Sequence, residues 1–332
     1  MTRKQGKVAV IGAGAWGTAL ALVTLRAGNE VALWGRDETV IAAINAKRIN
    51  PRYLPDIVLD EGMSATSDIF EALDKADIVL LTTPAQSMRE ITEALGELVR
   101  PGTMIVSCAK GIDRETGLLP AEIAGDNLPG CPVAALSGPS FASDVARGLP
   151  TAVTVAAAEM ATAESLAARL SSPRFRCYAS DDLKGVELGG ALKNVMALAV
   201  GAARGLKLGA SAEAALFARG FAELVRLATA LGADPRTLTG LSGLGDLVLT
   251  CSGPQSRNFA YGVAMAGDVI PQGLPLAEGV FTASIAAQIA RQHDIEVPVI
   301  DAVNAVLEGR IAAAQAVSML MERPLKPEMR KG

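Results

Sequence analysis

The sequence is poor in the side chains that bind metals and form disulfides. It has one histidine, His293, and 4 cysteines among 332 residues, and the cysteines show no C-x-x-C spacing. Neither a multi-histidine metal site nor a thiolate cluster is therefore expected, and a reduced, cytoplasmic setting is the simplest interpretation. His293 lies in the polar stretch Arg291–Asp294, which is typical of the surface end of a helix, so any acid or base chemistry is expected to use another residue type.

Aromatic residues make up only 4% of the chain, although 50% of it is hydrophobic. The apolar mass is largely Ala, Leu and Val, which favours closely packed helices over an aromatic-filled sandwich. The net charge of −4 gives no sign of a nucleic-acid partner. The N-terminus leads directly into an apolar strand rather than a signal sequence. The longest apolar run, Val186–Leu206, carries Glu187, Lys193 and Arg204, so no membrane span is expected.

The segment 7–37 has the pattern of strand, glycine turn, helix and strand, with the motif GAGAWG at 12–17. This order predicts the first half of a dinucleotide-binding fold. Gly12 would let the chain turn sharply out of the strand, Gly14 would let a pyrophosphate approach the backbone, and Gly17 would let the helix pack closely. The alternative is a glycine-rich turn without a ligand.

The end of the second strand bears on which dinucleotide binds. NAD sites usually place an acidic residue there, which accepts a hydrogen bond from the ribose 2′-hydroxyl. Arg36 occupies this end, and a guanidinium suits a 2′-phosphate better than a hydroxyl, so NADP is favoured over NAD. Asp37 could still serve a ribose, and a solvated surface arginine is the alternative for Arg36.

Beyond residue 37, short apolar runs alternate with helical patterns. This alternation predicts a mostly parallel sheet and so an α/β, Rossmann-like N-terminal domain. Ligands bind at the carboxyl ends of parallel strands, where we expect Thr83, Lys110, Gly138 and Ser140.

From residue 183 onward the pattern becomes mostly helical, with loops rich in Gly, Pro and Ser. Helical segments are expected at 183–205, 211–231, 257–266, 279–292, 299–308 and 311–321. The domain boundary is placed near Asp181–Asp182. A dinucleotide-binding domain would then span 1–181, and an all-α substrate and catalytic domain would span 182–332.

Four stretches of this second half are not explained by packing alone. Lys193 lies in an apolar run after two glycines, where it either reaches water or is held by a partner, as a catalytic lysine would be. The glycine-rich stretch 240–245 permits close backbone approach, and Asp246 after it can pair with a lysine. The motif SRN at 256–258 suits an anion such as phosphate, with an N-cap and a solvated arginine as the alternative. The fourth stretch is the motif AEG, in which Glu278 either serves the site or only caps the helix that follows.

The motifs GAGAWGTALA, LWGRD, AKGID, SGPSFA, GVELGGALKNVMA, GLSGLGDLVLTC, SRN and AEG occur in this order along nearly the whole chain. In this the sequence resembles NAD(P)-dependent glycerol-3-phosphate dehydrogenases of the bacterial type. The resemblance implies a fold like that of 6-phosphogluconate dehydrogenase. It implies reversible reduction of dihydroxyacetone phosphate to sn-glycerol 3-phosphate with NADPH, or with NADH, which supplies glycerophospholipid synthesis. A homodimer is expected by analogy with helix-rich second domains of this kind.

The resemblance also implies roles for individual residues, with Lys193 as proton donor and acceptor. Substrate positions would be Lys110, Gly138, Ser140, Lys193, Asp246, Ser256, Arg257 and Asn258. Cofactor positions, together with Gly12, Gly14 and Gly17, would be Ala15, Trp16, Arg36, Lys110, Ala142, Arg257, Leu276 and Glu278. The segment from Met265 to Leu276 is shorter than the family's usual helix and loop.

In the mechanism that this implies, Asp246 and Asn258 orient Lys193 or the substrate hydroxyl, and Lys110 stabilises developing negative charge. Arg257 and backbone N–H groups hold the phosphate. The residues by themselves, without the resemblance, also permit two other functions. One is a β-hydroxyacid dehydrogenase, which would turn over a carboxylate without a phosphate. The other is a non-catalytic dinucleotide sensor, which would not need a lysine in the second domain.

Overall fold

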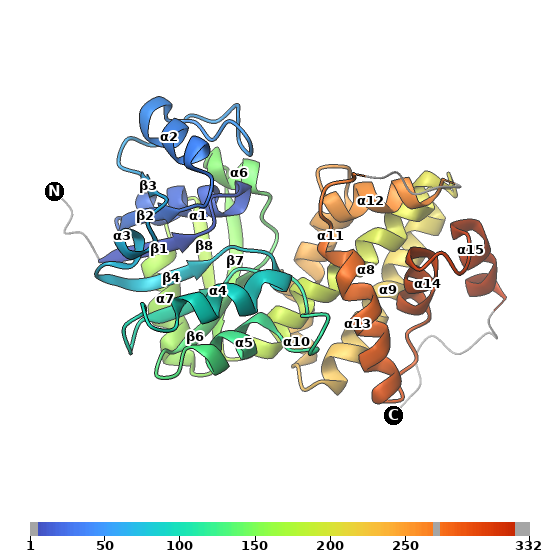
Figure 1. The fold of residues 1–332 in the computed structure, drawn as a ribbon. Coiled ribbons are helices and arrows are strands. Elements are labelled where there is room, and N and C mark those ends of the chain that lie inside the picture. The colour runs from blue at the N-terminus through green and yellow to red at the C-terminus, as the bar shows by residue number, and fades with distance from the viewer. Residues whose placement is uncertain (1–5, 268–272, 323–332) are drawn as a thin grey trace.

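The computed structural model describes residues 6–267 and 273–322. Within these ranges the chain forms two lobes that lie side by side, an N-terminal lobe built on a β-sheet and a C-terminal lobe of helices (Figure 1). The last strand ends at Ser180, and the first helix of the second lobe begins at Leu183. The expected order of an α/β domain followed by an all-α domain is confirmed.

The sheet of the described residues has eight strands in the order β3-β2-β1-β4-β5-β6-β7-β8. The strands are β1 (Lys7–Ile11), β2 (Glu30–Trp34), β3 (Ser64–Thr66), β4 (Ala76–Leu81), β5 (Met104–Ser107), β6 (Val133–Ser137), β7 (Thr151–Ala157) and β8 (Phe175–Ser180). Neighbouring strands are parallel except β6 and β7, so the prediction of a mostly parallel sheet is confirmed. Val8 and Val10 of β1 pack on one face, and Ala9 and Ile11 pack on the other. Burial on both faces explains why the strands are continuous apolar runs in the sequence.

Helices cover both faces of the sheet (Figure 1). They are α1 (Ala15–Arg26), α2 (Glu38–Lys47), α3 (Ile69–Leu73), the 3₁₀ turn η1 (Ala85–Ser87), α4 (Met88–Leu95), α5 (Pro120–Asn127), α6 (Ala142–Ala146) and α7 (Met160–Leu170). Helices α1, α2, α6 and α7 pack on the face of Val8, and α3, α4 and α5 pack on the face of Ile11. Since α1 begins at Ala15, within the glycine motif, its free N–H groups lie at the carboxyl end of β1.

The C-terminal lobe is organised around one long helix, α8. Its elements are α8 (Leu183–Gly205), α9 (Ala210–Ala230), α10 (Pro235–Leu238), the π-helical turn η2 (Leu241–Gly245), α11 (Asp246–Cys251), α12 (Arg257–Met265), α13 (Glu278–Gln292), α14 (Pro298–Leu307) and α15 (Ala313–Met321). Helices α9, α11, α12, α13 and α14 all contact α8. By length and composition α8 could cross a membrane. However, 94% of its apolar 18-residue stretch is buried inside the protein, as in the core helix of a globular lobe.

Two short helices, α10 and α11, lie where the sequence pattern predicted loop. The glycines between them have low helix propensity, which hid the helical turns. Their small size is needed for packing, because a Cβ on Gly243 would lie 2.0 Å from the carbonyl oxygen of Leu238. A Cβ on Gly189 of α8 would lie 3.0 Å from the carbonyl oxygen of Ser242. This contact brings η2 against α8 and places Asp246, the first residue of α11, beside it.

Helices α8 and α12 also cross at glycines, which leads to a prediction. A Cβ on Gly262 would lie 2.2 Å from the carbonyl oxygen of Leu198 in α8. Gly262→Ala should therefore force the helices apart and lower the free energy of unfolding by about 1–3 kcal/mol, measured by urea denaturation. Gly125→Ala is the matched control, because the nearest atom to its Cβ, on Val133, is 4.0 Å away. Equal unfolding free energies for the two variants would contradict the prediction.

Candidate active site

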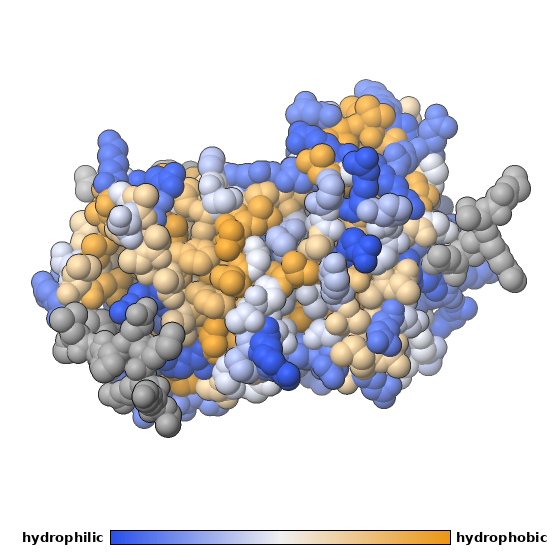
Figure 2. All heavy atoms as spheres, turned by 180° about the vertical axis from the view of Figure 1, so that it is seen from behind, coloured by the Kyte–Doolittle hydropathy of each residue, from blue (hydrophilic) through white to orange (hydrophobic). Residues whose placement is uncertain are grey.

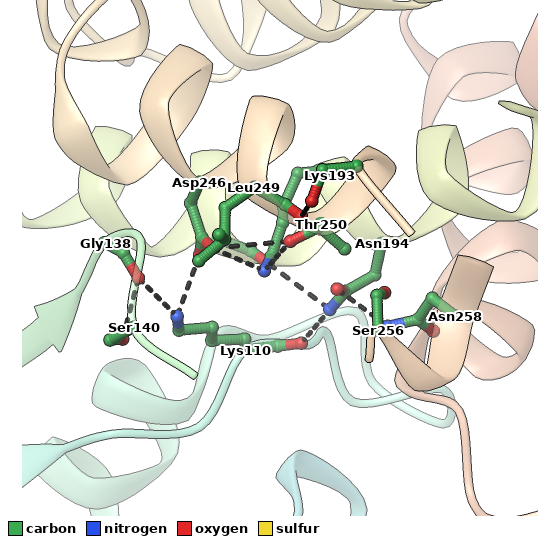
Figure 3. A network of polar contacts seen from close by, with 12 residues as sticks. Lys110, Gly138, Ser140, Lys193, Asn194, Asp246, Leu249, Thr250, Ser256 and Asn258 are labelled. Carbon is green, nitrogen blue, oxygen red and sulfur yellow. Dashed lines mark hydrogen bonds and ion pairs between the residues drawn. The ribbon is translucent and has the colours of Figure 1, made fainter. Parts of the chain in front are cut away.

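Three charged side chains from both lobes meet in one buried cluster (Figure 3). Asp246 contacts two ammonium groups: Lys193 Nζ lies 2.8 Å from its Oδ1, and Lys110 Nζ lies 2.8 Å from its Oδ2. Lys193 comes from the middle of α8, and Lys110 comes from the loop after β5. The side chain of Asp246 is 2% exposed and that of Lys193 is 7% exposed, so water does not screen this pair.

The cluster combines two cations with one anion, and this sets the protonation of its members. Burial lowers the pKa of Lys193 to about 8; Asp246 opposes that shift and the ammonium of Lys110 reinforces it. Burial alone would raise the pKa of Asp246, but Lys110 and Lys193 together hold that pKa below its usual value. Lys193 is therefore an ammonium that loses its proton close to physiological pH, as a general acid requires.

Each lysine has a second acceptor that fixes its direction. Lys193 Nζ donates to Oγ1 of Thr250 at 2.7 Å, one helical turn after Asp246 on α11. Lys110 Nζ donates to the carbonyl oxygen of Gly138 at 2.9 Å, and the hydroxyl of Ser140 donates to the same oxygen at 2.8 Å. The two ammonium groups are thus oriented before any substrate binds, which lowers the reorganisation needed during a reaction.

A chain of amide hydrogen bonds links the lobes beside this cluster. Gly279 N donates to Oδ1 of Asn258 at 2.9 Å, Asn258 Nδ2 donates to Oδ1 of Asn194 at 2.9 Å, and Asn194 Nδ2 donates to the backbone oxygen of Lys110 at 2.8 Å. Asn258 therefore contacts Asn194 rather than Lys193. Consecutive residues of α8 point in directions about 100° apart, so Asn194 faces α12 while Lys193 faces α11.

The motif SRN forms the N-terminus of α12, close to these amides (Figure 3). Ser256 is the N-cap, and its hydroxyl accepts a hydrogen bond from Phe259 N at 3.2 Å. Arg257 follows on the surface, and Asn258 is buried. A guanidinium and the free N–H groups of a helix start together favour an anion. The capping role left open for Ser256 is present, and it leaves the arginine available to solvent.

The glycine motif has the geometry that a dinucleotide-binding turn needs. Gly12 has a φ of +121°, which side chains disfavour. Apart from its neighbours in the chain, no atom of the described residues lies within 4 Å of a Cβ built on Gly14, so the backbone there is open to a ligand. A Cβ on Gly17 would lie 1.8 Å from the carbonyl oxygen of Gly12, so glycine is required for α1 to pack onto the turn.

Several buried polar atoms near this edge of the sheet have no hydrogen-bond partner among the described residues. They include Trp16 Nε1, Thr83 Oγ1, Ser107 Oγ, Ser137 Oγ, Ser242 Oγ and Glu278 Oε2. Buried polar atoms are rarely left unpartnered in folded proteins, so these atoms fit a site that a polar ligand completes. Together with the open backbone at Gly14, they fit an elongated dinucleotide laid along the carboxyl ends of the strands.

Glu278 joins the helical lobe to this edge of the sheet. Its Oε1 accepts from Ala85 N at 3.3 Å, and its Oε2 lies 2.9 Å from the position of a Cβ on Gly111. Burial raises the pKa of Glu278, and the N–H of Ala85 and the charge of Arg257 oppose this. The side chain makes no capping hydrogen bond to α13, so the capping role left open from the sequence is replaced by a contact between lobes.

The other residues of the cofactor prediction lie at three places. Arg36 is exposed directly after β2, Ala142 is the first residue of α6, and Leu276 is 41% exposed before α13. Residues 268–272 of the shortened segment before Glu278 lie outside the described residues.

Two side chains of the cluster, Thr250 and Asn194, were missed from the sequence. Thr250 lies four residues after Asp246 and so shares its helix face, a spacing that points to contact once 246–251 is known to be helical. Asn194 follows Lys193 directly, but its partner Asn258 is 64 residues away, and only the fold brings the two together.

Comparisons with known proteins agree along the chain. Residues 7–163 match the family described as NAD-dependent glycerol-3-phosphate dehydrogenase N-terminus, and residues 182–318 match the corresponding C-terminus. The chain is 58% identical over 326 residues to glycerol-3-phosphate dehydrogenase [NAD(P)+] of Mesorhizobium japonicum, covering 98% of this chain and 95% of that protein. It is 56% identical over 321 residues to the protein of the same name from Chelativorans sp., covering 97% and 98%.

Solved structures share the fold. The glycerol-3-phosphate dehydrogenase of Coxiella burnetii superposes with a TM-score of 0.90 at 38% identity, covering 96% of this chain and 99% of that one. A PanE/ApbA family ketopantoate reductase from Ralstonia eutropha superposes with a TM-score of 0.60 at 19% identity, covering 94% and 99%, which is a likeness of fold. The two-lobed architecture therefore occurs both in a glycerol-3-phosphate dehydrogenase and in a ketopantoate reductase.

Proposed function

Because the chain belongs to the NAD(P)-dependent glycerol-3-phosphate dehydrogenase family, we propose that Lys193, Asp246 and Lys110 form the proton-transfer centre of that reaction. The enzyme reduces dihydroxyacetone phosphate to glycerol 3-phosphate with NAD(P)H. The observation that carries the proposal is the buried Nζ of Lys193, held between Asp246 at 2.8 Å and Thr250 at 2.7 Å.

The chemistry assigns a separate role to each charged group. When bound, the reduced nicotinamide would supply a hydride to the ketone carbon. Lys193, as an ammonium, gives a proton to the oxygen that becomes the alcohol, and in the reverse direction neutral lysine accepts it. Asp246 keeps Lys193 in place and favours its charged form. Lys110 adds a second positive charge near the developing alkoxide.

The substrate phosphate is assigned to the N-terminus of α12, with Ser256, Arg257 and Asn258, and to backbone near Gly138 and Ser140. Arg257 is exposed there, and its charge lowers the pKa of Glu278 against the effect of burial, so we assign it to both the phosphate and the cofactor. Binding a dianionic phosphate at a fixed point positions the carbonyl against Lys193. A carboxylic hydroxyacid lacks this anchor, which disfavours the hydroxyacid alternative.

The shifted pKa of Lys193 gives a pH prediction with opposite signs in the two directions. Ketone reduction needs the ammonium, so its kcat/KM should fall as pH rises through about 8. Oxidation of glycerol 3-phosphate needs the neutral amine, so its kcat/KM should rise through about 8. Both follow from nicotinamide absorbance over a pH series. Lys193→Arg is the control, because a guanidinium does not titrate below about pH 12. If kcat/KM of Lys193→Arg showed the same fall and rise through about pH 8, the assignment of this titration to Lys193 would be contradicted.

The substrate and the cofactor are tested together by following oxidation of NADPH and of NADH with dihydroxyacetone phosphate. Rapid oxidation is expected, and NADPH is expected to be the better donor because Arg36 lies just beyond the end of β2. Oxidation of NADPH or NADH with a 3-keto acid in place of dihydroxyacetone phosphate would support the hydroxyacid alternative. Binding of NADPH without turnover of any ketone would support the sensor alternative.

The wider role and setting are part of the same proposal. The division at Asp181–Asp182 assigns cofactor binding to 1–181 and substrate binding with proton transfer to 182–332. The enzyme is assigned to the cytoplasm, where it supplies glycerol 3-phosphate for glycerophospholipid synthesis. Expression should restore growth without glycerol to a bacterial strain that lacks its own glycerol-3-phosphate dehydrogenase, and failure of an active, soluble product to do so would refute that role.

A homodimer is also proposed, through the outer side of α9. Figure 2 shows a broad apolar surface on the half of the molecule that holds the helical lobe. Ala214, Ala215, Ala218 and Ala222 of α9 are exposed, and Phe217 beside them is half-buried. Apolar surface of this kind is covered in stable assemblies. Sedimentation velocity should give a dimer for the native chain and a monomer for Ala218→Arg, and a monomeric native chain would rule the dimer out.

A further inference from the structure

The carboxylate that follows β2 is already engaged within the protein. Asp37 is the N-cap of α2, and its Oδ1 accepts from Thr39 N at 3.0 Å, Thr39 Oγ1 at 2.6 Å and Val40 N at 3.3 Å. These hydrogen bonds, first that of the Thr39 hydroxyl, lower the pKa of Asp37. A ribose 2′-hydroxyl would have to compete with them for the same oxygen.

The other oxygen of Asp37 points toward a second arginine. Arg52 Nη1 lies 3.4 Å from Asp37 Oδ2, and its guanidinium lies 5.3 Å from the ring centroid of Tyr53. The side chains of Arg52 and Asp37 are 64% and 42% exposed. An ion pair this exposed contributes little free energy, so the guanidinium can turn to a stronger anion at small cost.

The loop that carries Arg52 is fixed against the glycine turn. Asn50 is fully buried, and its Nδ2 donates to the backbone oxygen of Ala13 at 3.0 Å and to Oγ1 of Thr18 at 2.8 Å. Its Oδ1 accepts from Tyr53 N at 3.2 Å. The backbone on both sides of Arg52 is therefore held, although its side chain is exposed.

The end of β2 lies against the same turn. A Cβ on Gly35 would stand 2.5 Å from the Cβ of Ala13, so Arg36 leaves β2 next to the glycine motif. In this fold the adenine-side ribose occupies the space between the glycine turn and the end of the second strand. Arg36 is exposed just beyond the end of that strand, and the guanidinium of Arg52 lies beside Asp37, the next residue along the chain.

We propose that Arg52 is a specificity-determining residue for NADPH, and that its guanidinium binds the ribose 2′-phosphate together with Arg36. A phosphate dianion makes shorter and stronger hydrogen bonds with a guanidinium fork than an exposed carboxylate does. Arg52 also offsets the negative charge of Asp37, which would otherwise repel the phosphate. This inference rests on the proposed cofactor site and adds a residue to it.

Steady-state kinetics of Arg52→Gln with each reduced nicotinamide tests the proposal. The KM for NADPH should rise by about 10- to 100-fold, with KM for NADH and both kcat values within about twofold of the native enzyme. Lys47→Gln is the matched control, because it removes one exposed positive charge at the end of α2. It should leave the NADPH to NADH ratio within about twofold. Arg52→Lys keeps the charge without the fork and should give an intermediate KM for NADPH.

A ligand with the 2′-phosphate alone separates recognition from loop structure. Adenosine 2′,5′-bisphosphate should compete with NADPH in the native enzyme and lose about tenfold or more in potency in Arg52→Gln, while 5′-AMP should be unaffected. Equal losses for NADPH and NADH, or no loss for either, would overturn the role of Arg52. A native enzyme that turns over neither nicotinamide with dihydroxyacetone phosphate would instead refute the proposed function, so the two failures are distinguishable.

Discussion

Lys193→Met should lower kcat for reduction of dihydroxyacetone phosphate by about 10³-fold, within the range that general acid catalysis supplies. Methionine preserves much of the side-chain volume and removes the only charge of the lysine. Asp246 stays paired with Lys110 at 2.8 Å, so the buried carboxylate is not left alone and the fold should persist. The dissociation constant of NADPH, measured by fluorescence titration, should stay within about twofold of the native value. The reason is that Lys193 is assigned to proton transfer and not to binding of the cofactor.

Lys184→Met is the control for this result. Lys184 lies on the same helix, α8, but its side chain is 46% exposed and pairs with Glu122 at 3.5 Å. Its removal should leave kcat unchanged because exposed pairs contribute little. Turnover by Lys193→Met within tenfold of the native rate would remove Lys193 from proton transfer. A lost affinity for NADPH would show that Lys193 supports the fold of the site rather than its chemistry.

Asp246→Asn should have the second largest effect of the substitutions considered. It should change both the pH profile of the reduction rate and the free energy of unfolding. Without the carboxylate, the ammonium groups of Lys193 and Lys110 face each other with no anion between them. Breaking a buried ion pair in this way costs about 3–5 kcal/mol of unfolding free energy, measurable by urea denaturation. Since Asp246 raises the pKa of Lys193, its removal should move the fall in reduction rate to a pH below about 8.

The exposed Asp126 of α5 provides the comparison, and Asp126→Asn should change neither the pH profile nor the unfolding free energy by more than about 0.5 kcal/mol. A shifted pH profile is the decisive readout, because a purely structural role of Asp246 would lower stability without moving the pKa of Lys193. An unchanged profile in a folded Asp246→Asn variant would therefore contradict the tuning role.

The cluster gives a chain with one histidine a buried group, Lys193, that can exchange a proton near neutral pH. His293 is exposed and ends α13, which confirms that it belongs to the surface. Burial moves the pKa of Lys193 down to about 8, and the neighbouring carboxylate keeps it from moving further. In the proposed mechanism, a lysine on a helix buried in the core takes a role that often falls to histidine.

The sequence by itself determined the architecture. The apolar runs that end at glycine or hydroxyl residues predicted the parallel strands, because strands buried on both faces need no polar alternation. The order of motifs predicted the family and, through it, Lys193, Asp246 and Lys110 as members of one site. Local chemistry also predicted Gly12 as the sharp turn, since this depends on neighbouring residues alone.

Only the tertiary structure decided how these groups act on one another. Lys110 and Asp246 are 136 residues apart, and their contact depends on η2 packing against Gly189 of α8. Pairing across such distances, like the burial that shifts the pKa of Lys193, is a property of packing and leaves no periodic trace in the sequence. The same holds for Arg52, which is an ordinary charged loop residue until Asn50 fixes its loop against the glycine turn and Asp37 proves to be engaged in capping α2.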